Sequence, residues 1–404
     1  MRRVVFVAVL LLAVTPFARA TAQTVVEFWH AHGAVEDTIQ AFAEEFNAQQ
    51  DEVRVEPRYV GSYNEVALRL IAALRSGDVP ALVTAEGTVV QRLARDGALA
   101  ELSARTDALP GELLDDLEPA LWRAGLVDGG RYGLPWNASI PVLVYNASVL
   151  SQLGVAPPAD WAAFESAADR LTTRNARGYI DVAAAFIFEA MVATRGGRLV
   201  TEDGRPDFAS PEAIATLEML ARMARAGHSL PRSFADLDQA LVDFARGKGM
   251  MAVAGQALIP EGERFAVTFD VASAPIPRGD DPGVPITGGQ LVLPRAASDA
   301  ERAGAFAFWR FLMEPERNAA WVRASFFLPT RRSVRTDLAD WYADSPLRSA
   351  GIEQLPYAVQ RPQVAGYALW QTFLEEAIER VTIGAADPAA ALREVQRRAL
   401  EGAR

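Results

Sequence analysis

Cysteine is absent from the whole 404-residue chain. Its absence excludes both a disulfide framework and a lipid-modified cysteine near the N-terminus. A chain of this length buries enough apolar surface to fold without disulfides, even when it is secreted. The same length exceeds what one hydrophobic core usually serves, so we expect two lobes.

Long hydrophobic runs are also missing. The apolar run at residues 4–14 falls short of the ~20 residues that a membrane-spanning helix needs. Two arginines precede this run, and small residues follow it up to Ala22. This order is typical of a secretory signal peptide cut after Ala20 or Ala22, and the short run disfavours the alternative of a membrane anchor. With no cysteine to carry a lipid, we expect a soluble mature chain in the periplasm of a double-membraned bacterium.

Basic residues are too few to balance the acidic ones. The chain has 40 Lys and Arg against 51 Asp and Glu, a net charge of −11. Removing residues 1–22 takes away three arginines and no acidic residue, which leaves −14. This surplus argues against nucleic acid as a partner. It leaves an anionic small ligand open, because a local site can differ in sign from the whole surface.

Histidine is scarce, and the three histidines (His30, His32 and His228) form no cluster with metal-ligand spacing. Neither a Gly-x-Ser-x-Gly nucleophile elbow nor a P-loop occurs. We therefore expect no metal, no cofactor and no catalytic residue.

An alternation of strand and helix patterns opens the mature chain. β-rich residues at 24–29, 53–59 and 81–84 predict three strands. Between them, apolar residues at helical spacing over 35–46 and a capping box at Ser62 predict two helices. Such βαβ alternation is typical of an open α/β sheet, which binds ligands at the C-terminal ends of its strands. The residues at those ends are Trp29, His30, Ser62, Tyr63, Ala85 and Glu86.

The stretch 131–146, RYGLPWNASIPVLVYN, predicts a crossover between two lobes. Pro135 and Pro141 cannot donate to a ladder, so a central strand should not begin before Val142. We expect the chain to leave the first lobe here, to expose residues 136–139 at a cleft, and to enter the second lobe as a strand. A loop rich in Gly, Asp and Pro at 278–285 predicts the return crossing.

These crossings divide the chain into a signal peptide (1–22), lobe one (23–135 plus 286–330) and lobe two (136–285 plus 331–404). The later part of the chain adds predicted helices at 148–155, 161–171, 210–227, 237–244, 301–313, 316–324, 367–381 and 389–399, and strands at 250–254, 272–277 and 290–293. The two prolines of 272–277 predict an edge strand. We expect an α/β protein of two lobes with a hinge and a ligand cleft between them.

Several short motifs, taken in their order, resemble one family. They are Phe28-Trp29-His30, Gly61-Ser62-Tyr63, Leu134–Leu143, Phe244–Met251, Gly288-Gly289 and Leu328-Pro329-Thr330. The chain resembles the substrate-binding proteins of ABC importers, in the extracellular family that includes maltose-type and glycerol-3-phosphate-type members, and it is nearest to the glycerol-3-phosphate-binding branch. The resemblance implies a periplasmic-binding-protein fold that closes on a small solute and hands it to transmembrane permease subunits. It also implies a monomer without enzymatic activity.

The ligand residues of that branch carry over in part. Tyr63, Glu86, Ser139 and Gly289 stand at ligand positions and are of the expected type. Other positions depart from the branch. Its pair of tryptophans is replaced by Ala183 and Phe186, a serine near Gly255 is missing, its turn tyrosine is Phe327, and the nearest equivalent of its phosphate-pairing arginine is Arg361.

Each candidate also has a purely structural interpretation. Trp29 and Trp136 form either a cleft wall or core, and His30 is a ligand donor or a structural hydrogen bonder. Gly288-Gly289 is an anion-binding nest of N–H groups or a tight turn. The full set of substrate-binding candidates is Trp29, His30, Tyr63, Glu86, Trp136, Ser139, Phe186, Gly255, Gly288, Gly289, Phe327 and Arg361.

Three hypotheses for function follow. The first is binding of a phosphorylated polyol, glycerol-3-phosphate or a glycerophosphodiester, on the strength of the four matching positions. The second is binding of a sugar or oligosaccharide, because the tryptophans and the tyrosine are lost and the stretch around Arg361 is more like sugar-binding members. The third is a secreted hydrolase, which would need a second carboxylate beside Glu86.

Overall fold

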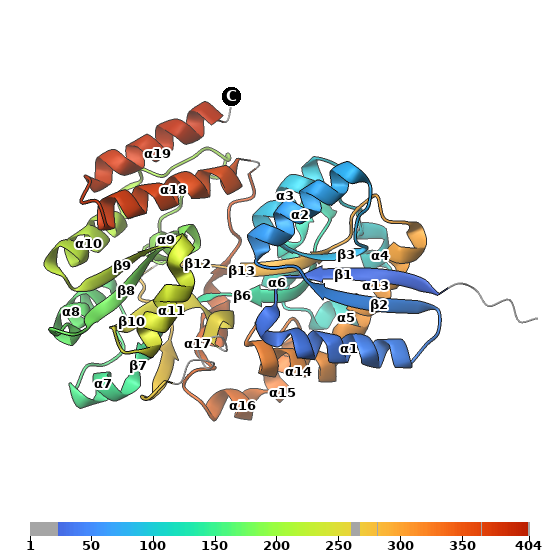
Figure 1. Cartoon of the computed structure of the whole chain (residues 1–404), viewed down its shortest axis with the longest axis horizontal. Coiled ribbons are helices and arrows are strands. Elements are labelled where there is room, and N and C mark those ends of the chain that lie inside the picture. Colours follow the sequence, from blue (N-terminus) through green and yellow to red (C-terminus); the bar gives the residue numbers. More distant parts are fainter. Residues whose placement is uncertain (1–22, 260–266, 281, 365, 403–404) are drawn as a thin grey trace, which may run out of the picture.

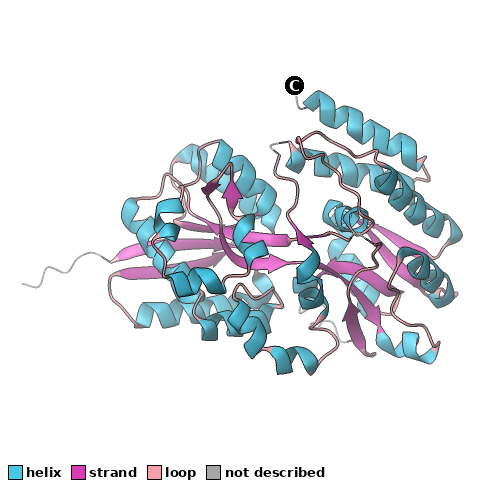
Figure 2. Cartoon of the chain, turned by 180° about the vertical axis from the view of Figure 1, so that it is seen from behind, coloured by secondary structure: helices cyan, strands magenta, loops and turns pink. Residues whose placement is uncertain are grey.

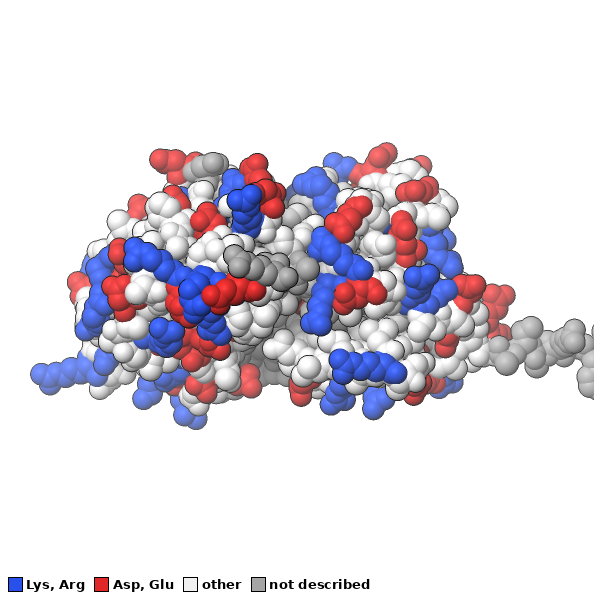
Figure 3. Space-filling model, turned by 90° about the horizontal axis from the view of Figure 1, so that it is seen from above, with Lys and Arg blue, Asp and Glu red and all other residues white. Residues whose placement is uncertain are grey.

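The computed structural model describes residues 23–259, 267–280, 282–364 and 366–402. The predicted signal peptide lies outside these residues. Among the described helices, none has the length and apolar character needed to cross a membrane. Basic and acidic side chains are interspersed over the face shown in Figure 3.

Two five-stranded sheets organise the molecule and lie in two lobes side by side (Figures 1 and 2). The first has the order β2 (Val53–Tyr59), β1 (Thr24–His30), β3 (Leu82–Glu86), β13 (Thr287–Val292) and β6 (Leu134–Ser139). The second has the order β11 (Val271–Ala274), β7 (Pro141–Asn146), β10 (Gly249–Gly255), β8 (Arg177–Ala183) and β9 (Ser229–Ser233). The predicted two-lobed α/β fold is therefore confirmed.

Each sheet mixes parallel and antiparallel pairs. In the first, β1 pairs in parallel with β2 and β3, while β13 runs antiparallel to β3 and β6. In the second, β8 pairs in parallel with β9 and β10, while β7 runs antiparallel to β10 and β11. The later strand β13 thus inserts between β3 and β6, and brings residues 287–292 beside Glu86.

The helices of the first lobe follow the expected patterns. α1 (Glu36–Ala48) buries Ile39, Phe42 and Phe46 against the sheet, as their spacing predicts. α2 (Tyr63–Ser76) begins with the predicted capping box of Ser62 and Glu65. The remaining helices here are α3 (Gly87–Arg95), α4 (Ser103–Asp107), α5 (Gly111–Asp116), α6 (Pro119–Ala124), α13 (Asp299–Leu312) and α14 (Pro315–Ser325), with a small ribbon of β4 (Leu126–Val127) and β5 (Gly130–Arg131).

Helices cover the second lobe, and the caps of one of them were predicted from the sequence. α10 (Pro211–Ala226) has Ser210 as its N-cap, whose side chain accepts from the N–H of Ala213, and Gly227 as its C-cap. The others are α7 (Ala147–Gln152), α8 (Trp161–Leu171), α9 (Ala185–Ala193), α11 (Leu237–Ala245), α18 (Tyr367–Thr382) and α19 (Pro388–Gly402). Short elements α15 (Arg332–Asp337), α16 (Ala339–Ala343), α17 (Ala350–Gln354), β12 (Val284–Pro285) and β14 (Ala358–Val359) complete the chain.

The first crossover differs from its prediction in two ways. Residues 136–139 do not form an exposed turn: they belong to β6 and are 0–6% exposed, and of the four only Ala138 lines the cavity described below. Pro135 is tolerated because β6 is an edge strand, where a missing N–H costs no ladder bond. The next strand, β7, begins at Pro141, opposite Gly255 and ahead of the expected Val142, because a first strand position also spares the N–H.

The chain returns between β12 and β13. β12 pairs with β14 on the side of the second lobe, and β13 joins the first sheet, so the passage falls at Ile286. Strand pairing also carries the first sheet to Ser139, beyond the boundary predicted after residue 135.

Candidate ligand site between the lobes

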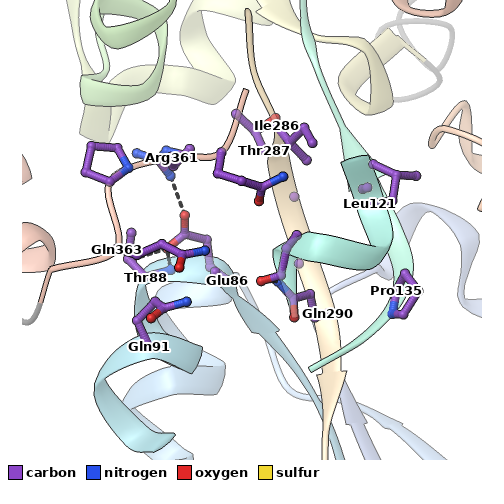
Figure 4. Close-up of a pocket in the computed structure, with 17 residues that line it drawn as sticks. Glu86, Thr88, Gln91, Leu121, Pro135, Ile286, Thr287, Gln290, Arg361 and Gln363 are labelled. Carbon is purple, nitrogen blue, oxygen red and sulfur yellow. Dashed lines mark hydrogen bonds and ion pairs between the residues drawn. The ribbon is translucent and has the colours of Figure 1, made fainter. Parts of the chain in front are cut away.

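A cavity of about 40 Å³ lies where the two lobes meet (Figure 4). Its wall comes from the end of β3 and the start of α3, from α6, from β6 and β13, and from the segment 360–363. The lining residues are Glu86, Gly87, Thr88, Gln91, Leu121, Ala124, Pro135, Ala138, Ile286, Thr287, Gly288, Gly289, Gln290, Gln360, Arg361, Pro362 and Gln363. Small-molecule pockets usually measure ~300–1,000 Å³, so in this arrangement of the lobes the cavity is smaller than a sugar-sized solute needs.

Glu86 is the acidic residue of this wall. It ends β3 and caps α3, where one carboxylate oxygen, Oε2, accepts from the N–H of Thr88 at 3.3 Å and from its hydroxyl. The other oxygen, Oε1, accepts from Nη1 of Arg361. Figure 4 shows this ion pair joining Glu86 to Arg361 on the facing segment. One carboxylate therefore caps a helix and also joins the lobes.

Arg361 is the basic residue of the wall. Its Nε donates to Oε2 of Glu189 on α9 at 3.0 Å, and the hydroxyl of Tyr367 donates to the same oxygen at 2.8 Å. The remaining nitrogen, Nη2, is buried and has no hydrogen-bond partner among the described residues. A buried N–H without a partner is costly, so Nη2 is suited to donate to an oxygen of a ligand.

Burial and charge act in opposite directions on this cluster. Burial alone would lower the pKa of Arg361, but Glu189 and Glu86 outweigh it and raise that pKa, so the guanidinium stays charged. Burial raises the pKa of Glu189, against the effects of Arg361 and of the Tyr367 hydroxyl. One cation is thus shared between two carboxylates.

The segment 360–363 also holds the lobes together through hydrogen bonds that involve backbone carbonyl groups. Nε2 of Gln360 donates to the carbonyl oxygen of Ala120 at 2.8 Å. The carbonyl oxygen of Gln363 accepts from Nη2 of Arg95 on α3 at 3.1 Å. Together with the Arg361–Glu86 pair, these bonds fasten the segment to three points of the first lobe.

Two glutamines belong to the wall. Nε2 of Gln91 donates to the carbonyl of Leu126 at 3.1 Å, and Nε2 of Gln290 donates to that of Ala124 at 2.8 Å. The side-chain oxygens of both glutamines are buried and accept no hydrogen bond from a described residue. Oε1 of Gln290 packs against Gly133, which does not line the cavity, so the acceptors of this side are the carboxylate of Glu86 and the amide oxygen of Gln91.

Gly288 and Gly289 lie in the strand next to Glu86. Gly288 has φ of 82°. Gly289 pairs with Asn137 and Gln290 with Pro135, so the register shift leaves Trp136 as the extra residue of a bulge in β6. Gly289 pairs with Glu86 on one side and Asn137 on the other, which directs its backbone groups into the sheet. The two glycines therefore lie in a central strand of the first sheet and line the cavity.

Tyr63 lies behind Gly289. A Cβ on Gly289 would come within 2.8 Å of Cε1 of the Tyr63 ring, and the Tyr63 hydroxyl pairs with Nδ2 of Asn137. Burial, followed by the nearby charge of Glu86, raises the pKa of Tyr63, so the phenol stays protonated. Nδ2 of Asn137 also lies 3.1 Å from Nε2 of His32. This network of Tyr63, Asn137 and His32 in the first lobe therefore supports Gly289, which lines the cavity.

Buried rings surround the network. Trp136 is 1% exposed and stacks on Trp321, with ring centroids 4.2 Å apart, so it belongs to the core and forms no cleft wall. Phe327 stacks on the other side of this cluster, 5.6 Å from Trp321. His30 is fully buried, and burial lowers its pKa to about 4, so it is neutral. These three candidates pack in the core of the first lobe.

The other candidates also lie outside the cavity. Nε1 of Trp29 donates to Glu27 at 2.8 Å. Oγ of Ser139 accepts from the N–H of Ala257 at 3.2 Å, which ties the crossover to the second lobe. Gly255 pairs with Pro141, and Phe186 lines a separate apolar cavity of the second lobe. Of the twelve candidates, the four that line the cavity are Glu86, Gly288, Gly289 and Arg361.

The sequence analysis missed two glutamines of this wall, Gln91 and Gln290, and also Glu189, which lies behind the wall and holds Arg361. Glu189 is the one charged residue in an otherwise apolar helix, AFIFEAMVA, and a single charge inside a buried helix was a signal that it needed a partner. Gln91 and Gln290 carried no such signal, because the sequence does not show that their amides are buried.

A family model supplies the class of the protein. The model described as bacterial extracellular solute-binding protein matches residues 41–350. The chain belongs to this family. Its members are non-catalytic, and they serve ABC transporters as the component that captures the solute outside the cytoplasm. A small ligand and the permease subunits are thus the partners of this chain.

The named relatives of this chain are distant in sequence. The chain is 24% identical over 375 residues to the sn-glycerol-3-phosphate-binding periplasmic protein UgpB of Brucella abortus, covering 85% of this chain and 84% of the relative. UgpB from Mycobacterium tuberculosis in complex with glycerophosphocholine is similar in structure, with a TM-score of 0.82, 20% identity, and coverage of 94% and 98%. The GacH receptor of Streptomyces glaucescens, solved unliganded and with acarbose, gives 0.83 at 22% identity over 94% and 98%. At these low identities, the similarity shows that the solved structures have the same fold as this chain.

Proposed function

We propose that the chain captures a small polyhydroxylated solute between its lobes in the periplasm and delivers it to the permease of an ABC importer. One observation carries the proposal: groups from both lobes, Glu86 and Arg361, face one cavity and touch there. A site assembled from both lobes couples binding to closure, since the complete set of contacts exists only when the lobes meet.

An uncharged sugar or polyol is the first candidate. The carboxylate of Glu86 and the amide oxygen of Gln91 supply hydrogen-bond acceptors to the wall, which suits a ligand with O–H donors. The cation in the wall, Arg361, is already paired with two carboxylates. This charge balance reverses the order of the first two hypotheses from the sequence.

A phosphorylated polyol is the second candidate. Two observations support it: the names of the curated relatives and the unpartnered Nη2 of Arg361, which could donate to a phosphate oxygen. The carboxylate of Glu86 in the same wall opposes it, because like charges repel at short range.

A thermal-shift panel separates the candidates. A ligand at a hundred times its Kd adds about 2.7 kcal/mol to the free energy of unfolding. We expect neutral sugars or polyols to raise the melting temperature and their phosphate esters to have no effect. Stabilisation by the esters alone, weakening as salt is added, would favour the second candidate. A panel in which no member binds would count against the cavity as a polyol site.

A further inference from the structure

We propose that Glu189 determines the charge of the ligand that this cavity accepts. Glu189 holds the guanidinium of Arg361 in a buried ion pair, so that Arg361 offers hydrogen bonds to a ligand without offering net positive charge. The inference rests on the proposed function, in that the interlobe cavity is taken as the ligand site. Glu189 itself does not line the cavity, and it therefore acts through Arg361.

The Glu189–Arg361 pair belongs entirely to the second lobe. Glu189 is 5% exposed on α9, and Oε2 accepts from both Arg361 and Tyr367, at 3.0 and 2.8 Å. Tyr367 begins α18, is fully buried, and its ring centroid lies 5.8 Å from Cζ of Arg361. No atom of the first lobe is needed for these contacts. The pair therefore persists when the lobes separate, while the bond from Arg361 to Glu86 is broken.

Charges around the cavity sum to a negative value. Arg361 faces Glu189 and Glu86, which leaves one carboxylate uncompensated. Arg95, which donates to the carbonyl of Gln363, does not line the cavity and is itself paired with Asp128 at 3.0 Å. Glu375, whose carboxylate accepts from the N–H of Ala185, adds no positive charge; burial raises its pKa to about 7. A phosphate would therefore meet no free cation among the described residues that face it.

Each nitrogen of the guanidinium then has a distinct role. Nε is committed to Glu189, Nη1 meets Glu86 in the closed form, and Nη2 is buried without a partner. A ligand hydroxyl can accept from Nη2 and donate to the carboxylate of Glu86. A phosphate oxygen can accept from Nη2 but has no proton for Glu86, and its charge is opposed by both carboxylates.

The substitution Glu189→Gln tests this role while preserving shape. The amide oxygen of Gln can still accept from Tyr367 and Arg361, but its negative charge is gone. Glu165→Gln is the matched control, since Glu165 pairs with Arg222 in the same lobe at 3.0 Å and does not line the cavity. We use sn-glycerol 3-phosphate as the probe, titrated by calorimetry into the wild type and both variants at low and at physiological salt.

We expect Glu189→Gln to bind the probe at least ~10-fold more tightly than the wild type, as an unmasked charged hydrogen-bond donor should. The gain should shrink as salt rises, should be absent in Glu165→Gln, and should vanish in the double variant Glu189→Gln/Arg361→Gln. If the wild type already binds the probe as tightly as Glu189→Gln does, or if the gain survives the loss of Arg361, the inference is wrong.

A second variant and a separate measurement keep this test decisive. If Glu189→Gln does not fold, Glu189→Met removes the same charge in a similar volume and carries the same expectation. Failure of the proposed function is seen separately, as the absence of stabilisation of the wild type by any sugar or polyol. The response of the variant to the phosphate probe is measured whatever that panel shows.

Discussion

Arg361 of the second lobe and Glu86 of the first form an ion pair across the ligand cavity, with side chains only 10% and 22% exposed. The pair joins the lobes at the cavity that we propose as the ligand site. A solute that binds there competes with this internal contact, which stabilises the closed arrangement in the absence of a solute. If the protein is closed without a ligand, it must open before a solute can bind, and this lowers its apparent affinity for the solute. The ion pair therefore affects the capture of the solute.

Glu86→Gln should shift the unliganded protein toward an open form. Breaking one partner of a partly buried pair worth about 1–3 kcal/mol changes an open-to-closed ratio by about 5- to 150-fold. The cysteine-free chain allows two single cysteines to be labelled, at Leu68 on α2 and Leu369 on α18, which are 68% and 52% exposed. The distance between spin labels at these sites should lengthen in the variant. An unchanged distance distribution, with Glu165→Gln as control, would contradict the prediction.

Gly289→Ala should damage both stability and binding. A Cβ there would lie 2.8 Å from the carbonyl oxygen of Ala85 and from Cε1 of Tyr63, closer than such atoms approach. We expect a loss of about 1–3 kcal/mol in the free energy of unfolding, measured in urea, since the strand must shift. Gly111→Ala is the control, because a Cβ at Gly111 meets no atom within 4 Å. Equal stability of the two variants would show that β13 tolerates a side chain at position 289.

Trp321→Ala should be among the most destabilising core substitutions. Trp321 is 1% exposed and stacks against Trp136 and Phe327. Truncating a fully buried tryptophan costs about 3–5 kcal/mol. Leu369→Ala, at a 52% exposed position, should change stability by less than about 0.5 kcal/mol. A loss for Trp321→Ala no larger than for Leu369→Ala would exclude a tight aromatic core here.

Asp181→Asn should flatten the dependence of stability on pH. Asp181 is 2% exposed in β8, and burial raises its pKa to about 7, against ~3.9 in an unfolded chain. Between these values the native state keeps a proton that the unfolded state has lost, so the free energy of unfolding falls as pH rises toward 7.

From pH 5 to pH 8 the wild type should therefore lose about 2–3 kcal/mol relative to Asp181→Asn, as measured by urea unfolding at both pH values. Other titrating groups, such as His30 and Glu375, are common to both proteins and cancel in the comparison. Parallel pH profiles would show that Asp181 is already ionised in the native state.

The local elements follow from the sequence alone. The capping box at Ser62, the Ser210-Pro211 helix start and the spacing of Ile39, Phe42 and Phe46 act over a few residues, and each predicted its helix correctly. The order of the motifs likewise predicted the family and the two lobes. Glu86 was found as a candidate because residues at the ends of sheet strands converge by topology.

Only the tertiary structure decided which candidates meet. The ion pairs of Arg361 join residues 172 and 275 positions apart, and no local pattern encodes such distances. Burial decided the rest. Trp136 carries the right chemistry for a cleft wall, but an edge strand and the ring of Trp321 place it in the core. The charge of the site, and with it the ligand that suits it, depends on Glu189, whose partner the sequence does not reveal.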